Sequence, residues 1–209
     1  MEVIGILEHG PDLESTNADE NYFSTLCRVP RLINGVRLLR GVESNIIDEK
    51  GNIDVSKNML RDLDYIMVGF HKNAGYEDSG VKKNTEAMVG AIKSGKVDII
   101  THPFMTAQYK FDMKKIAEEA CKNKVLLEIN LHYIREKKLL EDTISNLKII
   151  VKTVKKYKQK VILNSDSHNI WELGDDSSLG PVKKKIGLTD DMIINNYPKE
   201  LFRLLKIKI

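Results

Sequence analysis

The amino-acid sequence predicts an α/β fold built on a parallel sheet or barrel. Six short apolar runs recur along the 209 residues, and helix-length amphipathic segments or turn-bearing connections separate them. Such alternation is typical of repeated strand–helix units. The length suits one domain with a single large core, and no shift in composition marks a linker. We therefore expect one domain over residues 1–209.

The apolar runs are predicted to be strands at residues 3–7, 36–42, 65–69, 97–101, 125–129 and 161–163. Apolar positions spaced three and four apart predict the main helices at residues 84–93, 111–123, 141–157 and 198–205. Shorter helical turns are expected at residues 56–62, where Ser56 can act as an N-cap, and at 181–186 and 189–194. A β-hairpin is predicted at residues 46–55, and a loop over the site at 72–83.

The composition narrows the class of protein. The net charge is +3, from 33 basic and 30 acidic residues, which argues against nucleic acid as the main partner. Cys27 and Cys121 are far apart and have no CxxC spacing, so neither a disulfide framework nor a thiolate metal site is expected. No apolar run approaches the length of about 20 residues that spans a bilayer. These features predict a cytoplasmic protein.

Histidines and carboxylates stand at or just after the ends of the predicted strands. The set is His9, Glu43, His71, His102, Asp166 and His168. Because parallel strands end at one face of a sheet or barrel, we expect these side chains to lie together. Any one of them alone is more simply a loop or core residue, and for Glu43 an ion pair with Arg40 or a lysine is an equal alternative.

Imidazole and carboxylate ligands without thiolates suit zinc, iron or manganese in an open site. Two such cations about 3.5–4 Å apart can share a carboxylate and hold a hydroxide for attack at phosphorus. Glu43 is the candidate bridge because it is the acidic residue that closes its strand, and Asp166 would bind terminally.

The polar residues lie within six short blocks of sequence, which are Glu8 to Asp12, Leu39 to Ile46, Gly69 to His71, Thr101 to Pro103, Glu128 to Asn130 and Ser165 to His168. These blocks, in this order, resemble the polymerase and histidinol phosphatase (PHP) family of metal-dependent phosphoesterases, most closely its small stand-alone phosphatase-like members. The resemblance implies a distorted (β/α)7 TIM-like barrel with up to three divalent metals at the C-terminal ends of its strands.

The resemblance also implies roles for individual residues. Glu43 is similar to the bridging ligand, and Asp166 to a ligand of the first metal. His71 and His102 would complete the second metal with Glu43. His9 and His168 would belong to the third metal, and Glu43, Asp166 and His168 would form the catalytic group. Zinc is the expected metal, with manganese or iron as alternatives.

One departure from the PHP pattern is large. The family opens on a strand with an Asp-x-His-x-His-Thr signature, and this chain starts on what would be the second strand, with six βα units. The domain is therefore expected to be N-terminally incomplete, and only the second metal keeps its full ligand set. The gap would expose strand edges at residues 3–7 and 161–163, which predicts a homodimer or higher assembly.

The functional hypothesis from sequence is a metal-dependent phosphoesterase that hydrolyses a small phosphorylated metabolite. Near His132, the basic residues Arg135, Lys137 and Lys138 are candidates for binding the phosphate, although a solvated basic loop is the simpler interpretation. The alternative function is a catalytically impaired or truncated PHP protein that keeps partial metal binding and acts as an interaction module. A nuclease-like or polymerase-associated role is disfavoured by the balanced charge.

Overall fold

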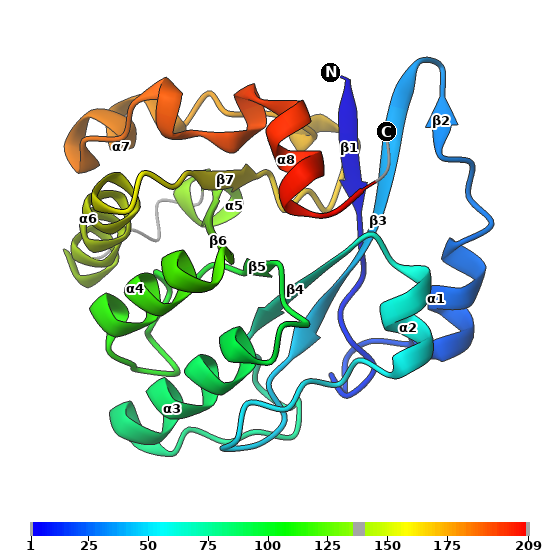
Figure 1. Ribbon diagram of the computed structural model, residues 1–209, viewed down its shortest axis with the longest axis horizontal. Coiled ribbons are helices and arrows are strands. Elements are labelled where there is room, and N and C mark those ends of the chain that lie inside the picture. The colour runs from blue at the N-terminus through cyan, green and yellow to red at the C-terminus, as the bar shows by residue number, and fades with distance from the viewer. Residues whose placement is uncertain (1, 136–140, 208–209) are drawn as a thin grey trace.

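A curled, mostly parallel sheet of seven strands forms the centre of the molecule. The computed structural model describes residues 2–135 and 141–207. The sheet order is β1-β3-β4-β5-β6-β7, with β2 paired antiparallel to β3. The strands are β1 (Val3–Ile6), β2 (Leu32–Ile33), β3 (Val36–Asn45), β4 (Tyr65–Gly69), β5 (Ile99–Ile100), β6 (Leu126–Asn130) and β7 (Val161–Asn164). Figure 1 shows the strands curling as an open half-barrel rather than a closed ring.

Three long helices cover the outer face of the sheet. These are α3 (Gly80–Lys93), α4 (Met113–Asn123) and α6 (Glu141–Lys156), which follow β4, β5 and β6 in turn. They pack side by side along the strands (Figure 1). Each is amphipathic, and its apolar stripe faces the sheet, as Met88, Ile116 and Leu147 illustrate.

The two faces of the sheet belong to two apolar clusters, because successive side chains of a strand point to opposite faces. One set packs against the outer helices and includes Val42, Val68, Ile100 and Leu127. The alternate set includes Leu39, Met67, Ile99 and Leu126 and packs against helix α8 (Pro198–Leu204). Burial on both faces explains why these strands are nearly continuous apolar runs.

Short elements complete the fold. Helix α1 (Glu20–Leu26) packs on α2 (Lys57–Asp62), and α5 (Leu131–Arg135) contacts α7 (Leu179–Ile186). The 3-10 turns are η1 (Ile170–Glu172), η2 (Asp190–Met192) and η3 (Ile194–Asn196). Within the described residues, no helix is long and apolar enough to cross a membrane.

Backbones cross closely where the loop before residue 52 meets α3. Gly51 has a φ of +81°, and a Cβ atom there would overlap the backbone of α3 at Ala87. A Cβ atom at Gly90 would in turn overlap the carbonyl oxygen of Lys50. Glycine is therefore required on both sides of this contact.

The predicted α/β class and TIM-like architecture are confirmed, and all six predicted strands are present. Ser56 caps α2 as predicted, since its side chain accepts a hydrogen bond from the Met59 amide. Strand β3 is longer than predicted because its pairing with β4 continues to Asn45. Glu43 therefore lies within the strand rather than after it.

Two local predictions differ from the structure, and one short helix was not predicted. The hairpin expected at residues 46–55 is reduced to a single bridge between Ile46 and Ile53. Helix α3 begins at Gly80, so the loop expected at 72–83 is shorter. Helix α5 was missed, although Asn130 precedes it and accepts a hydrogen bond from the His132 amide, a capping signal that was overlooked.

Candidate functional site

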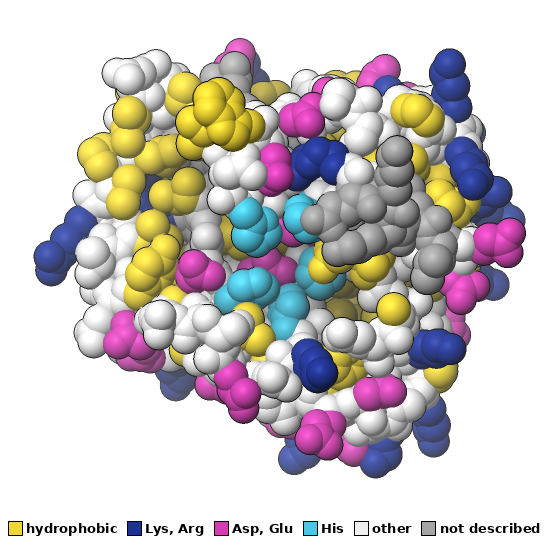
Figure 2. Space-filling model, turned by 180° about the vertical axis from the view of Figure 1, so that it is seen from behind, with side chains coloured by type: hydrophobic (Ala, Val, Ile, Leu, Met, Phe, Trp, Pro, Cys, Tyr) yellow, Lys and Arg dark blue, Asp and Glu magenta, His cyan; other side chains and the backbone are white. Residues whose placement is uncertain are grey.

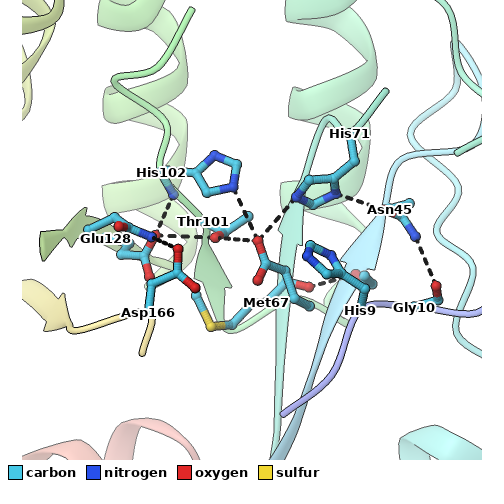
Figure 3. A network of polar contacts seen from close by, with 12 residues as sticks. His9, Gly10, Asn45, Met67, His71, Thr101, His102, Glu128 and Asp166 are labelled. Carbon is cyan, nitrogen blue, oxygen red and sulfur yellow. Dashed lines mark hydrogen bonds and ion pairs between the residues drawn. The ribbon is translucent and has the colours of Figure 1, made fainter. Parts of the chain in front are cut away.

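The candidate site lies at the edge of the sheet where the carboxyl ends of the parallel strands meet. His9 follows β1 and forms a bridge with Glu43 of β3, His71 follows β4, and His102 follows β5. Figure 3 shows His9, His71 and His102 converging on one centre. In Figure 2, histidine side chains surround a hollow on one face of the molecule, with acidic side chains between them.

Glu43 is the centre of this cluster. Its Oε1 accepts a hydrogen bond from Thr101 Oγ1 at 2.9 Å and lies 3.1 Å from His71 Nε2 and 3.2 Å from His102 Nε2. Burial raises the pKa of Glu43, but the His102 and His71 imidazoles, whose Nε2 atoms can donate to Glu43 when the rings are protonated, outweigh it and hold the pKa well below its usual range. The alternative ion pair with Arg40 does not form, since that guanidinium donates to the Val29 carbonyl instead.

The orientation of His71 is fixed by Asn45. His71 Nδ1 lies 2.7 Å from Asn45 Oδ1, and the Asn45 amide nitrogen donates to Asp54. Since the Asn45 oxygen can only accept, Nδ1 of His71 carries the proton, and Nε2 directs a lone pair toward Glu43 in the neutral ring. A second hydrogen bond of this kind is typical of histidines that bind metal ions. Burial lowers the pKa of His71, which favours the neutral ring.

His102 is held in a strained conformation. Its φ is +29°, and its backbone amide donates to Glu128 Oε2. Burial lowers the pKa of His102, but the hydrogen bond and charge of Glu43 outweigh it and raise the pKa overall. Burial also raises the pKa of Glu128 to about 7. Asn164 Nδ2 donates to Glu128 Oε1 at 2.7 Å.

His9, Glu43 and His71 have the composition and geometry of a cation site. Each offers a ligand atom, and these atoms all lie within 4.8 Å of one another. The His9 ring meets His71 edge-on, with 4.9 Å between centroids, and His9 Nδ1 is buried without a hydrogen-bond partner among the described residues. Two imidazoles and a carboxylate with an open position suit zinc. The residues present therefore fit a divalent ion.

The other two predicted ligands lie farther along the same edge. Asp166 Oδ2 accepts a hydrogen bond from Asn130 Nδ2 at 3.1 Å. His168 is exposed, and the structure groups it with His132 and Glu172 rather than with His9. Of the predicted ligands, His9, His71 and His102 thus lie around Glu43, which we call the central cluster. His168 instead belongs to a second group with His132 and Glu172, which we call the rim cluster.

Of the predicted phosphate-binding residues, only Arg135 lies within the described part of the chain. Its guanidinium donates to the carbonyl oxygens of Ser165 at 2.8 Å and Asp175 at 3.3 Å. Arg135 therefore ties two loops together. Lys137 and Lys138 lie outside the described residues.

Sequence reasoning missed several residues that shape the site. Thr101 and Asn45 orient the central cluster, and both are buried polar residues at strand ends, a signal that could have identified them. Glu172 joins the rim cluster from η1, four residues after His168. It follows no strand, so the strand-end rule could not find it.

The curled parallel sheet with polar residues at its carboxyl edge places the chain among the TIM-like α/β proteins. Comparison with protein families gives a narrower assignment. The chain belongs to the RNase P subunit p30 family, whose profile matches residues 29–203. The match extends from just before β2 into α8 and so includes almost all of the sheet.

Two solved structures share the fold. One is a chain in the cryo-EM structure of archaeal ribonuclease P with mature tRNA, with a TM-score of 0.54 and 15% identity over 97% of this chain and 80% of that chain. The other is a histidinol phosphate phosphatase from Lactococcus lactis in complex with zinc, L-histidinol and phosphate. Its TM-score is 0.55, with 10% identity over 90% of this chain and 83% of that chain.

These findings correct the functional interpretation of the sequence. The assignment to the PHP family was wrong, and so was the phosphatase of small metabolites that followed from it. The physical reason is that both kinds of protein place polar side chains at the ends of the same kind of sheet, so short strand-end blocks report the fold more than the function. The expectation that nucleic acid is not a main partner was also wrong, because a near-neutral total charge does not describe local charge.

Proposed function

We propose that this protein is a subunit of a tRNA-processing ribonucleoprotein of the RNase P type, in which it contacts RNA and partner proteins. The observation that carries the proposal is the family match over residues 29–203. The likeness to an archaeal ribonuclease P chain over 97% of this chain supports it. Two free cysteines, Cys27 and Cys121, fit the cytoplasmic setting that we propose for this role.

A basic surface suited to RNA lies on two neighbouring helices. Helix α7 carries three lysines and no acidic residue, and it packs on α6, whose last turn is also basic. Lys184, Lys185 and Lys152 are exposed. Lysines presented in this way can neutralise phosphates of a nucleic-acid backbone without reading its sequence.

Reconstitution tests the proposal directly. The chain would be combined with the RNase P RNA and the other protein subunits of the same organism, and cleavage of precursor tRNA would be measured with and without it. We expect the chain to join the assembly and to raise the cleavage rate at limiting magnesium. An assembly that forms and cleaves equally well without the chain would overturn the proposal.

Charge-reversal variants locate the RNA-binding surface. Changing Lys184 and Lys185 to Glu should weaken RNA binding and flatten the dependence of log K on log salt by about 0.7–0.9 for each phosphate that the protein no longer neutralises. Lys57→Glu on α2, which lies far from α7 (Figure 1), is the matched control and should change neither quantity. Equal weakening by both changes would show that α7 does not bind the RNA.

We also propose that His9, Glu43 and His71 hold a divalent cation, with zinc as the first candidate and manganese or iron as alternatives. His102 contacts the same oxygen of Glu43 and would stabilise the ligand set from the other side. A bound ion would offer an open coordination position to an oxygen ligand. His71→Ala should remove this metal from the purified chain, as measured by elemental analysis, whereas unchanged metal content would refute the ligand assignment.

A further inference from the structure

We propose a second divalent-metal site at the rim of the hollow, formed by His132, His168 and Glu172. One ligand atom from each residue lies within 4.8 Å of the others. The two imidazole centroids are 5.4 Å apart, with 50° between the ring planes. Two imidazoles and one carboxylate, without thiolates, form a ligand set for zinc that leaves a coordination position open, and cobalt, nickel and copper suit the same ligands.

The three ligands come from three different elements, each fixed by hydrogen bonds of its own. His132 lies on α5, where its backbone amide donates to Asn130 Oδ1 at 3.0 Å. Glu172 ends η1, whose first turn is capped by Asn169, since its Oδ1 accepts from the Trp171 amide at 3.0 Å. His168 follows β7. The ligands are thus positioned by the fold before any ion binds.

The hydrogen bond of His168 favours metal binding by its other ring nitrogen. His168 Nδ1 lies 3.0 Å from the carbonyl oxygen of Asp166. Because a carbonyl oxygen only accepts, Nδ1 carries the proton and Nε2 keeps its lone pair in the neutral ring. A histidine that donates one ring N–H to a backbone carbonyl and binds metal with the other nitrogen is a common arrangement in metalloproteins.

Glu172 is held near the two rings by two contacts, one of which is an ion pair with Arg135. Its Oε2 accepts from the His168 amide at 3.3 Å and from Arg135 at 3.4 Å. Arg135 makes a shorter bond to the Ser165 carbonyl at 2.8 Å, so its main role is to join the loops. A carboxylate beside two imidazoles is a ligand set suited to a dication, and Arg135 keeps the carboxylate in place.

Tyr133 separates this rim site from the central cluster. Its ring packs edge-on against His132, with 5.6 Å between centroids, and against His102, with 5.4 Å. The Tyr133 ring therefore lies between two clusters that have no ligand in common. A substitution can remove a ligand from one cluster and leave the ligands of the other in place.

The fluorescence of Trp171 can report metal binding at the rim site. Trp171 is the only tryptophan of the sequence, it is directly next to Glu172, and it is 85% exposed. A paramagnetic ion such as Co²⁺ bound to Glu172 should therefore quench the fluorescence of Trp171. Because the central ligands come from other elements, the same ion at His71 should quench it less.

The experiment is a titration of the full chain, stripped of metal with a chelator, with Co²⁺ and separately with Zn²⁺. Tryptophan fluorescence, visible cobalt absorption and metal equivalents per chain would be recorded. The variants are Glu172→Gln and His168→Ala for the rim site and His71→Ala for the central cluster. Asp176→Asn, which removes an exposed charge from the same loop, is the matched control. Circular dichroism would establish that each variant is folded.

We expect Glu172→Gln and His168→Ala to lose one metal equivalent and the saturable quenching of Trp171, while His71→Ala and Asp176→Asn retain the quenching. Quenching that is identical in wild type and Glu172→Gln, or that does not saturate below millimolar Co²⁺, would overturn the proposal. Because the readout uses metal alone, its result is independent of any binding to RNA.

Discussion

Asp98 offers a quantitative test of burial at the end of the sheet opposite the site. It precedes β5, and its Oδ2 accepts a hydrogen bond from the Ile66 amide at 2.9 Å. Burial raises the pKa of Asp98 from 3.8 to about 6. The folded state therefore binds a proton more tightly than the unfolded chain does. The stability contributed by this proton is present at low pH and is lost as pH rises between about 4 and 6.

The magnitude follows from the difference of about 2 between the two pKa values. At about 1.4 kcal/mol for each pKa unit, the charged Asp98 costs the folded state up to about 3 kcal/mol at neutral pH. Asp98→Asn keeps an oxygen for the Ile66 amide and carries no charge. We therefore expect the variant to be more stable than wild type at pH 7 and equally stable near pH 4.

Urea denaturation, monitored by circular dichroism from pH 4 to pH 7.5, would measure the free energy of unfolding of Asp98→Asn and of wild type. Subtracting the free energy of unfolding of wild type from that of the variant at each pH cancels the contributions of the other titrating groups. Asp176→Asn, at an exposed position, should run parallel to wild type throughout. A difference in the free energy of unfolding between Asp98→Asn and wild type that does not change with pH would refute the reasoning.

The remaining predictions concern local structure. Gly90→Ala should destabilise the fold by about 1–3 kcal/mol, because the added methyl group would overlap the carbonyl oxygen of Lys50. A Cβ atom at Gly180 in α7 would meet no atom within 4 Å, so Gly180→Ala should be neutral or stabilising by up to about 1 kcal/mol. A loss of stability in both glycine variants would contradict the steric argument. Asp112→Ala should cost about 1 kcal/mol, because Asp112 Oδ1 accepts from the Lys115 amide at 3.0 Å and caps α4. Chemical denaturation measures each change, and an Asp112→Asn control that loses as much stability as Asp112→Ala would contradict the capping role.

Much of the fold could be predicted because the strands are buried on both faces. Residues such as Val42, Met67 and Ile100 pack into one apolar cluster or the other, so apolar residues fill most strand positions and the apolar runs mark the strands. The central cluster could be predicted for a related reason. His71 and His102 stand immediately after such runs, and parallel strands bring their carboxyl ends together.

The rest depended on information that strand patterns do not contain. Glu172 reaches the rim through a 3-10 turn, and His132 through a helix too short to show periodicity. The family was misassigned because the polar blocks mark the ends of strands in several kinds of TIM-like protein. The partner class was misjudged because the sum of charges over the whole sequence carries no information on where the charges lie, and α7, for example, carries three lysines in its last turn.

The attachment of Glu43 to the sheet has a consequence for substitutions at this edge. Its backbone is bonded on the β1 side, where the Glu43 amide donates to Glu8 and its carbonyl accepts from Gly10. The backbone hydrogen bonds and the two apolar clusters hold the sheet together, and the polar side chains of the site extend from the carboxyl ends of its strands. The side chains at this edge can therefore change without breaking the backbone hydrogen bonds that join the strands.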